Sequence, residues 1–145
     1  MAHARQQIRE QLATTLTGLT TTASRVYDTR LYAYDTLPCL TVYADKDTVD
    51  EERSSQTKHW HDLALRVEAR AKAKDSVEDT IDTICAEIEA AIYADTTLNG
   101  KVFDVFVADT QIEYSVEQDQ PVALATLTLN ATYRVAPSAP TTLAN

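Results

Sequence analysis

The chain is poor in glycine, with only two among its 145 residues. Loops that cradle a phosphate need glycine, because only a residue without a side chain lets the backbone approach the ligand closely. The shortage argues against a nucleotide-binding fingerprint, and the sequence contains no glycine-rich motif. It also predicts a chain built from helices and strands rather than from tight functional loops.

Cysteine is scarce as well: Cys39 and Cys85 lie far apart and form no CxxC pair. Structural zinc sites and thioredoxin-like redox motifs depend on such spacings. We expect two buried free thiols in apolar elements, which raise rather than lower a thiol pKa. The sequence also lacks a GxSxG nucleophile elbow. We therefore expect neither an enzyme nor a cofactor.

Positive charge is the third shortage: 13 lysines and arginines stand against 22 carboxylates, for a net charge of -9. Affinity for nucleic acid comes mainly from cations that displace condensed counterions, so duplex binding is not expected. No apolar run approaches the ~18 residues that a membrane-spanning helix needs, and the first residues lack a signal-peptide pattern. The composition predicts a soluble intracellular protein.

Hydrophobic periodicity predicts two helices. Apolar residues at steps of four indicate an amphipathic helix over about residues 2–17, with Gly18 just past its C-terminus. A second stripe indicates a helix over 76–94, capped by Asp75 or Ser76. That stripe consists of Val77, Ile81, Ile84, Ile88 and Ile92.

Apolar runs and alternation predict the strands. Short runs indicate strands over 24–28, 37–43 and 102–107, the last continuing weakly beyond its end. Strict alternation indicates long strands with one buried face from residue 58 onward and over 122–135. The expected fold class is α+β, a mainly antiparallel sheet of about four to five strands with two principal helices packed on one face.

These elements make a single domain over residues 1–135. The remaining segment, 136–145, is rich in small polar residues and proline and has no anchoring apolar stripe, so we expect a mobile tail. Residues 44–57 are polar throughout. They form either a solvated loop or the tip of a long hairpin.

His59-Trp60-His61 is the one cluster with metal-ligand character, since two histidines at spacing two on a strand point the same way. No third ligand stands at a diagnostic spacing, so we favour the interpretation that both histidines continue the apolar face. Trp60, on the opposite face, is expected to be an interface or packing anchor. We expect no basic, aromatic-interleaved surface around it, as a stacking platform would require.

Charge is distributed in blocks along the chain. Residues 58–74 hold five cations and two carboxylates, whereas residues 75–100 hold seven carboxylates and no cation. This is either an ordinary solvated surface or a set of complementary contacts between copies of the chain. On the second interpretation, the candidate subunit-interface residues are Trp60, Arg66 and Arg70.

Several residue blocks resemble the tail terminator proteins of long-tailed bacteriophages, of the lambda minor tail protein U type. The blocks are Arg25-Val26-Tyr27, Leu37-Pro38-Cys39-Leu40-Thr41-Val42-Tyr43, Leu63-Ala64-Leu65-Arg66-Val67-Glu68-Ala69, Leu98-Asn99-Gly100 and Ala131-Thr132-Tyr133-Arg134-Val135. The resemblance covers nearly the whole chain. It implies a small α+β subunit that forms a hexameric ring on the head-proximal end of the tail tube. The ring stops tube polymerisation and presents a surface to head-completion proteins.

The resemblance also implies partners and a location. The partners are further copies of the chain, the tail tube protein and a head-completion or neck protein, in the virion and, during assembly, in the host cytoplasm. DNA passes through such a ring without specific binding, and an acidic lumen would repel its phosphates within a Debye length of ~8–10 Å. We therefore expect channel-facing or partner-facing carboxylates in the second helix or among Asp45, Asp47, Asp50, Glu51 and Glu52.

Other interpretations stay open. Phage neck and tail-completion subunits share a similar size and polarity. A small metal-binding protein could use His59 and His61. A ligand-binding α+β domain could form its pocket by packing alone, which leaves no trace in a sequence.

Overall fold

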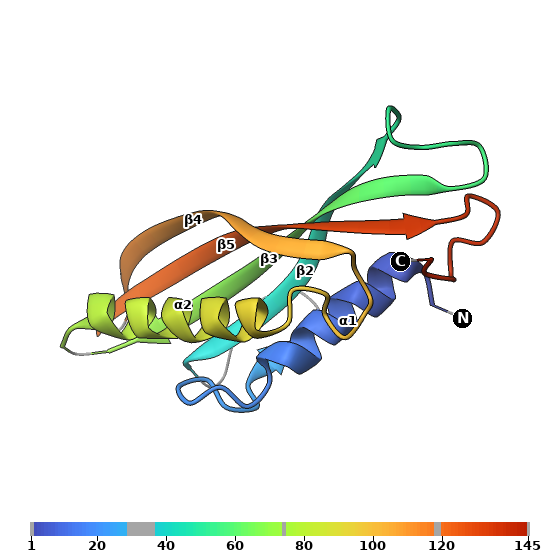
Figure 1. Cartoon of the computed structure of the whole chain (residues 1–145). Coiled ribbons are helices and arrows are strands. Elements are labelled where there is room, and N and C mark those ends of the chain that lie inside the picture. Colours follow the sequence, from blue (N-terminus) through green and yellow to red (C-terminus); the bar gives the residue numbers. More distant parts are fainter. Residues whose placement is uncertain (1, 29–36, 74, 118–119, 145) are drawn as a thin grey trace.

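The structure, a computed structural model, describes residues 2–28, 37–73, 75–117 and 120–144. Its elements are α1 (Ala4–Leu16), β1 (Val26–Tyr27), β2 (Cys39–Asp50), β3 (His59–Lys72), α2 (Val77–Ala94), β4 (Asp104–Glu117) and β5 (Gln120–Val135). The strands form a five-stranded sheet in the order β1-β2-β3-β5-β4. All neighbours are antiparallel except β1 and β2. The predicted α+β class is confirmed (Figure 1).

Both helices pack on the same face of the sheet, α1 next to β2 and α2 across β3 and β5 (Figure 1). The predicted stripes form the core: Ala4, Ile8, Leu12 and Leu16 of α1 are fully buried. The α2 stripe is fully buried too, apart from Val77, which is 3% exposed. Ser76 stands at the N-cap of α2 as predicted, but its side chain makes no capping hydrogen bond. Its left-handed φ of 56° departs from the extended backbone that N-capping geometry uses.

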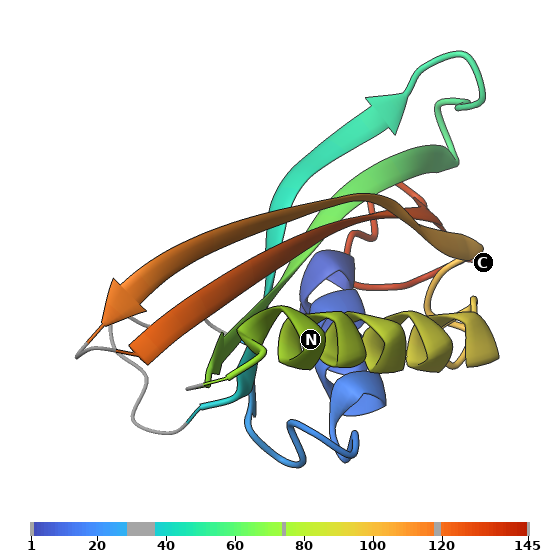
Figure 2. The same cartoon turned by 90° about the vertical axis from the view of Figure 1, so that its left-hand side faces the viewer.

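Two long hairpins extend from this core (Figure 2). Residues 44–57 belong to the β2–β3 hairpin, because β2 continues to Asp50 and only the turn before His59 is irregular. The hairpin alternative for this polar segment is therefore the correct one. In the second hairpin, β4 pairs with β5 as far as Glu117, well beyond the predicted strong segment 102–107. Lys74, in the basic block of the sequence, lies outside the described residues.

A β-bulge decides which face the end of β2 presents. The pairing with β3 shifts register between Ala44 and Lys46. Because side chains alternate along a strand, one extra residue turns every later side chain to the other face. Asp47 is therefore paired with Leu63 and shares its helix-facing side, whereas Asp45 stays on the opposite, uncovered face.

The C-terminal segment, residues 136–144, lies against α1 (Figure 1). The backbone N–H of Ala4 donates to the Pro140 carbonyl at 2.9 Å, and Leu143 packs against the core. The segment has no apolar stripe, and its contact with the core comes from one leucine, which leaves no periodic signal in the sequence. Its mobility stays a prediction.

None of the described helices is long and apolar enough to cross a membrane.

Candidate functional site

Four polar side chains from four elements meet behind the bulge of β2. Asp47, with a side chain only 7% exposed, accepts a hydrogen bond from the Tyr133 hydroxyl at 2.5 Å. Its carboxylate lies 2.8 Å from His61 Nδ1 and 3.2 Å from Arg5 Nη1. Burial, and then the Asp47 carboxylate, raise the pKa of Tyr133, while burial lowers the pKa of His3 nearby. The Asp47 cluster, as we call Arg5, Asp47, His61 and Tyr133, ties the start of α1 to three strands.

The candidate carboxylates of the polar segment 44–57 therefore do not share one surface. Asp47 is a structural residue rather than a surface carboxylate, because the bulge turns it inward. Asp45 lies on the other face and pairs with Arg66 at 3.2 Å. Asp50, Glu51 and Glu52 remain together at the tip of the β2–β3 hairpin, where the last two are exposed. A channel-facing role for the exposed ones stays a prediction.

His59 and His61 point to the same side of β3, with ring centroids 6.3 Å apart. His61 is engaged with Asp47 and stacks on Tyr133, with ring centroids 4.7 Å apart. Within the part of the chain that the structure describes, no group of three His, Cys, Asp or Glu side chains could hold a metal ion. The metal-binding interpretation has no third ligand there.

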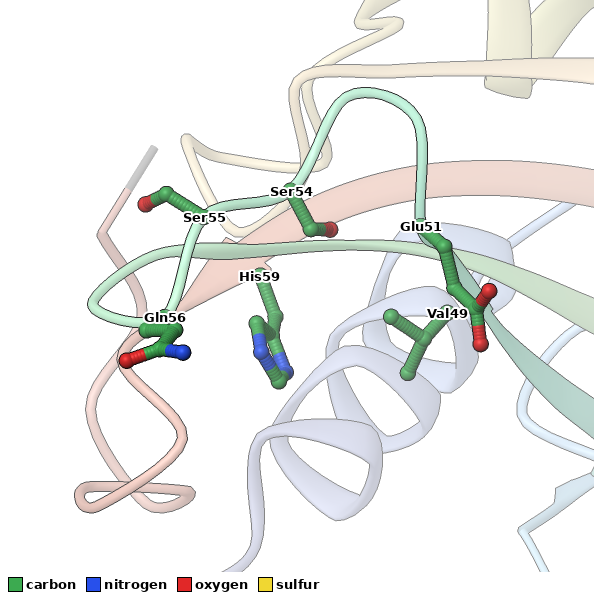
Figure 3. A pocket seen from close by; sticks show the side chains of 6 residues that line it. All are labelled: Val49, Glu51, Ser54, Ser55, Gln56 and His59. Atoms are coloured by element: carbon green, nitrogen blue, oxygen red, sulfur yellow. The ribbon is translucent and has the colours of Figure 1, made fainter.

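His59 borders an open depression of about 490 Å³ beneath the β2–β3 turn (Figure 3). The Ser54 hydroxyl, one of the five polar side chains around it, donates to the Asp50 carbonyl at 2.6 Å and accepts from the Trp60 N–H at 2.9 Å. It is thus committed to the turn. Within the described residues neither Ser54 nor Ser55 hydrogen-bonds to His59 or Glu51, so the depression shows no nucleophile paired with a base. Its lining residues are Val49, Glu51, Ser54, Ser55, Gln56 and His59.

On the opposite face of the sheet, cations and an aromatic ring surround Trp60. The Cζ atoms of Arg53 and Arg134 lie 4.0 Å and 4.6 Å from the indole centroid, and Phe103 meets the indole edge-on at 5.4 Å. The expectation that no basic, aromatic surface surrounds Trp60 is wrong. Residues far apart in the sequence meet here, because Trp60 pairs across the sheet with Arg134. We call these four residues the Trp60 cluster.

Arg66 and Arg70, the other candidate interface residues, lie on the same face as Trp60. Arg66 pairs with Asp45, and Arg70 lies 3.6 Å from the Glu68 carboxylate. Part of their charge is therefore balanced within the chain. Their role in a subunit interface stays a prediction.

Exposed apolar side chains gather along β4, the edge strand of the sheet. Phe106, Ile112, Tyr114 and Val116 are 43%, 37%, 52% and 72% exposed. Ile112 and Tyr114 stand on the helix-facing side, paired with the buried Ala125 and Ala123, but α2 does not cover them. Exposed apolar residues on an unpaired edge are a template for association with another chain. We call this surface the β4 edge.

The solvent-facing side of α2 is acidic. Glu78, Asp79, Asp82 and Glu89 are exposed, and no cation of the described residues forms an ion pair with them. Burial, followed by Glu89 and Asp82, raises the pKa of the Cys85 thiol to about 11. A channel-facing or partner-facing role for these carboxylates stays a prediction.

The thiols should be unreactive in the folded protein. Cys39 and Cys85 are both buried and free, as predicted, and burial raises the pKa of each. At pH 8 a pKa of about 11 leaves about one Cys85 in a thousand as thiolate. We expect Ellman's reagent to modify both thiols at least ~100-fold more slowly in buffer than in urea. Prompt labelling of either thiol in buffer would contradict their placement.

No known protein family and no curated protein matches the chain in sequence. Among solved structures, a chain in the virion of a native gene transfer agent particle is similar over 86% of this chain and 90% of that chain. The two share 13% sequence identity, with a TM-score of 0.41. At that identity and score, the similarity carries no argument about what this chain does.

Proposed function

We propose that the chain is a structural subunit of a phage-like virion, and within it a tail terminator rather than an enzyme. Copies form a hexameric ring that caps the head-proximal end of the tail tube, ends tube polymerisation and provides the docking surface for the head or neck. Support comes from the resemblance of the sequence blocks and from one structural observation. The chain offers a long apolar edge to a partner, whereas its described depressions assemble no catalytic group.

The β4 edge carries this proposal. Soluble proteins usually protect an edge strand with charges, prolines or bulges. β4 has a bulge between Val107 and Asp109 and carries carboxylates such as Glu113, which oppose uncontrolled pairing. Yet Tyr114 and Val116 leave apolar area that a specific partner would bury. A subunit that must join one partner and reject others needs both features.

The β2–β3 hairpin supplies the second part of the proposal. Its tip holds Asp50, Glu51 and Glu52 away from the core (Figure 2). In the proposed ring these carboxylates face the channel and repel the phosphates of passing DNA at short range. An image of the ring with the tips on its outer rim would contradict this arrangement.

The test is the mass of the purified chain by light scattering over a concentration series, with negative-stain imaging alone and on tail tubes. We expect six-membered rings at one end of each tube. Tyr114→Ser should weaken the association by about tenfold or more, because truncating a buried aromatic anchor removes an interface hot spot. Val49→Ser, an exposed apolar residue on the other hairpin, is the matched control and should leave association unchanged.

Other outcomes would select the alternatives. A chain that neither assembles nor binds tubes contradicts the proposal. A ring found only at the neck, with tube length unaffected, indicates a neck or tail-completion subunit. Stoichiometric zinc in elemental analysis, lost in His61→Ala, indicates a metal-binding protein.

A further inference from the structure

A cluster of arginines around Trp60 and the acidic side of α2 lie on opposite sides of the sheet. Trp60 alternates with the helix-facing His59 and His61 and therefore points away from the helices. α2, whose exposed side chains include Glu78, Asp82 and Glu89, packs on the other side of the sheet (Figure 2). Because the two surfaces are different and face away from each other, one copy could present each surface to a different neighbour.

The Trp60 cluster has the composition of an interface hot spot. Tryptophan and arginine are the residue types that most often dominate binding energy. Phe103 is 56% exposed, and the Arg53 side chain is 47% exposed. Asp50 offsets Arg53 only weakly, at 4.0 Å from its Nε. A guanidinium stacked on an indole ring is already ordered and can take a carboxylate with two hydrogen bonds.

The α2 face has the complementary chemistry. Glu78 and Asp82 stand four residues apart, so they are neighbours on the helix surface and repel each other. Glu89 lies about two turns beyond Asp82 on the same side of the helix. None of these carboxylates has a cation partner among the described residues. A cationic neighbour would remove this repulsion.

We propose that the Trp60 cluster is the docking site for the acidic face of α2 from a second copy of the chain. This inference rests on the proposed function, because it names a second contact between subunits of the ring, in addition to the β4 edge. Such a contact is heterologous, so it repeats from copy to copy and closes into a ring when the rotation allows. The other ligand with matching charge is single-stranded nucleic acid, but a net charge of -9 repels phosphates at longer range.

A charge exchange tests the contact. The first variant combines Arg53→Glu with Arg134→Glu, and the second combines Asp82→Lys with Glu89→Lys. Each alone places like charges on both surfaces and should associate at least ~10-fold more weakly than the wild type. In an equimolar mixture every contact between unlike copies pairs opposite charges, so association should return. Sedimentation velocity at low salt measures the weaker association of each variant alone and its recovery in the mixture. Lys46→Glu is the control and should associate like the wild type.

Trp60 provides a second readout, because it is the only tryptophan in the chain. Its emission should shift to the blue as the wild-type concentration rises, and the two variants should show this shift only when mixed. Arg53→Glu alone repeats the test at a side chain that is about half exposed, in case the double variant folds poorly. Urea unfolding of each variant shows whether its fold is intact.

Each contrary outcome is distinct. Rings that form equally well from either variant overturn this docking site and leave the terminator proposal standing. A wild type that stays monomeric at all concentrations, with no Trp60 shift, also overturns it, while binding to tail tubes tests the function separately. Oligonucleotide binding that depends on Arg53 and Arg134, without self-association, would assign the cluster to nucleic acid instead.

Discussion

Replacing Asp47 with alanine should lower the free energy of unfolding by about 1–3 kcal/mol, the usual cost of leaving a buried hydrogen-bonding group without its partner. The Asp47 side chain is only 7% exposed, and three donors converge on it. Its removal takes the shared acceptor from the buried Tyr133 hydroxyl and from His61, whose Nδ1 lies 3.3 Å from that hydroxyl, so the two groups keep only each other as partners. Arg5 adds little, because its side chain is 46% exposed. Urea unfolding followed by circular dichroism gives the value.

Asp45 provides the matched control, since it is a neighbouring carboxylate on the same strand. Its pair with Arg66 is 43% and 39% exposed, so Asp45→Ala should cost less than about 1 kcal/mol. Asp47→Asn keeps an acceptor for Tyr133 and should fall between the two. Equal costs for Asp45→Ala and Asp47→Ala would show that the bulge does not turn Asp47 inward.

Replacing Ile88 with alanine should cost about 2–5 kcal/mol, because it removes buried methyl groups and leaves a cavity. Ile88 is fully buried at the centre of the α2 stripe, and α2 packs on β3 and β5. Tm should fall by several degrees in a thermal scan.

Thr83→Ala, on the exposed side of the same helix, separates packing from helix propensity. It should change the free energy of unfolding by no more than about 0.5 kcal/mol. A cost below about 1 kcal/mol for Ile88→Ala would mean that the stripe does not face the sheet as described.

Local periodicity was enough to predict most elements. In α2, β3 and β5 apolar residues recur on one face over many residues, so the periodic pattern is strong. The edge strand β4 was harder to predict. The distal half of β4 is exposed on both faces, so its alternation is weak, and only pairing with β5 shows that the strand continues.

Neither the Asp47 cluster nor the Trp60 cluster could be predicted from the sequence, and the two reasons are related. Asp47 lies in a polar segment with Asp45 and Asp50. Nothing in the sequence of this segment marks the bulge that places Asp47 on the opposite face of the sheet from the other two. The neighbours of Trp60 come from a turn, from the segment before β4 and from the end of β5. Proximity of this kind depends on cross-strand register, which is a property of pairing between distant segments.

The scarcity of glycine and cations, the two amphipathic helices and the one-sided strands follow from the amino-acid sequence alone, because composition and periodicity are local properties. The sequence also contained the separation of acidic and basic blocks. Only the tertiary structure decided that Asp47 is buried, that the Trp60 cluster exists and that the apolar edge of β4 is left uncovered. Those features arise from a bulge, a register and the limited reach of α2, and each depends on how distant segments pack together.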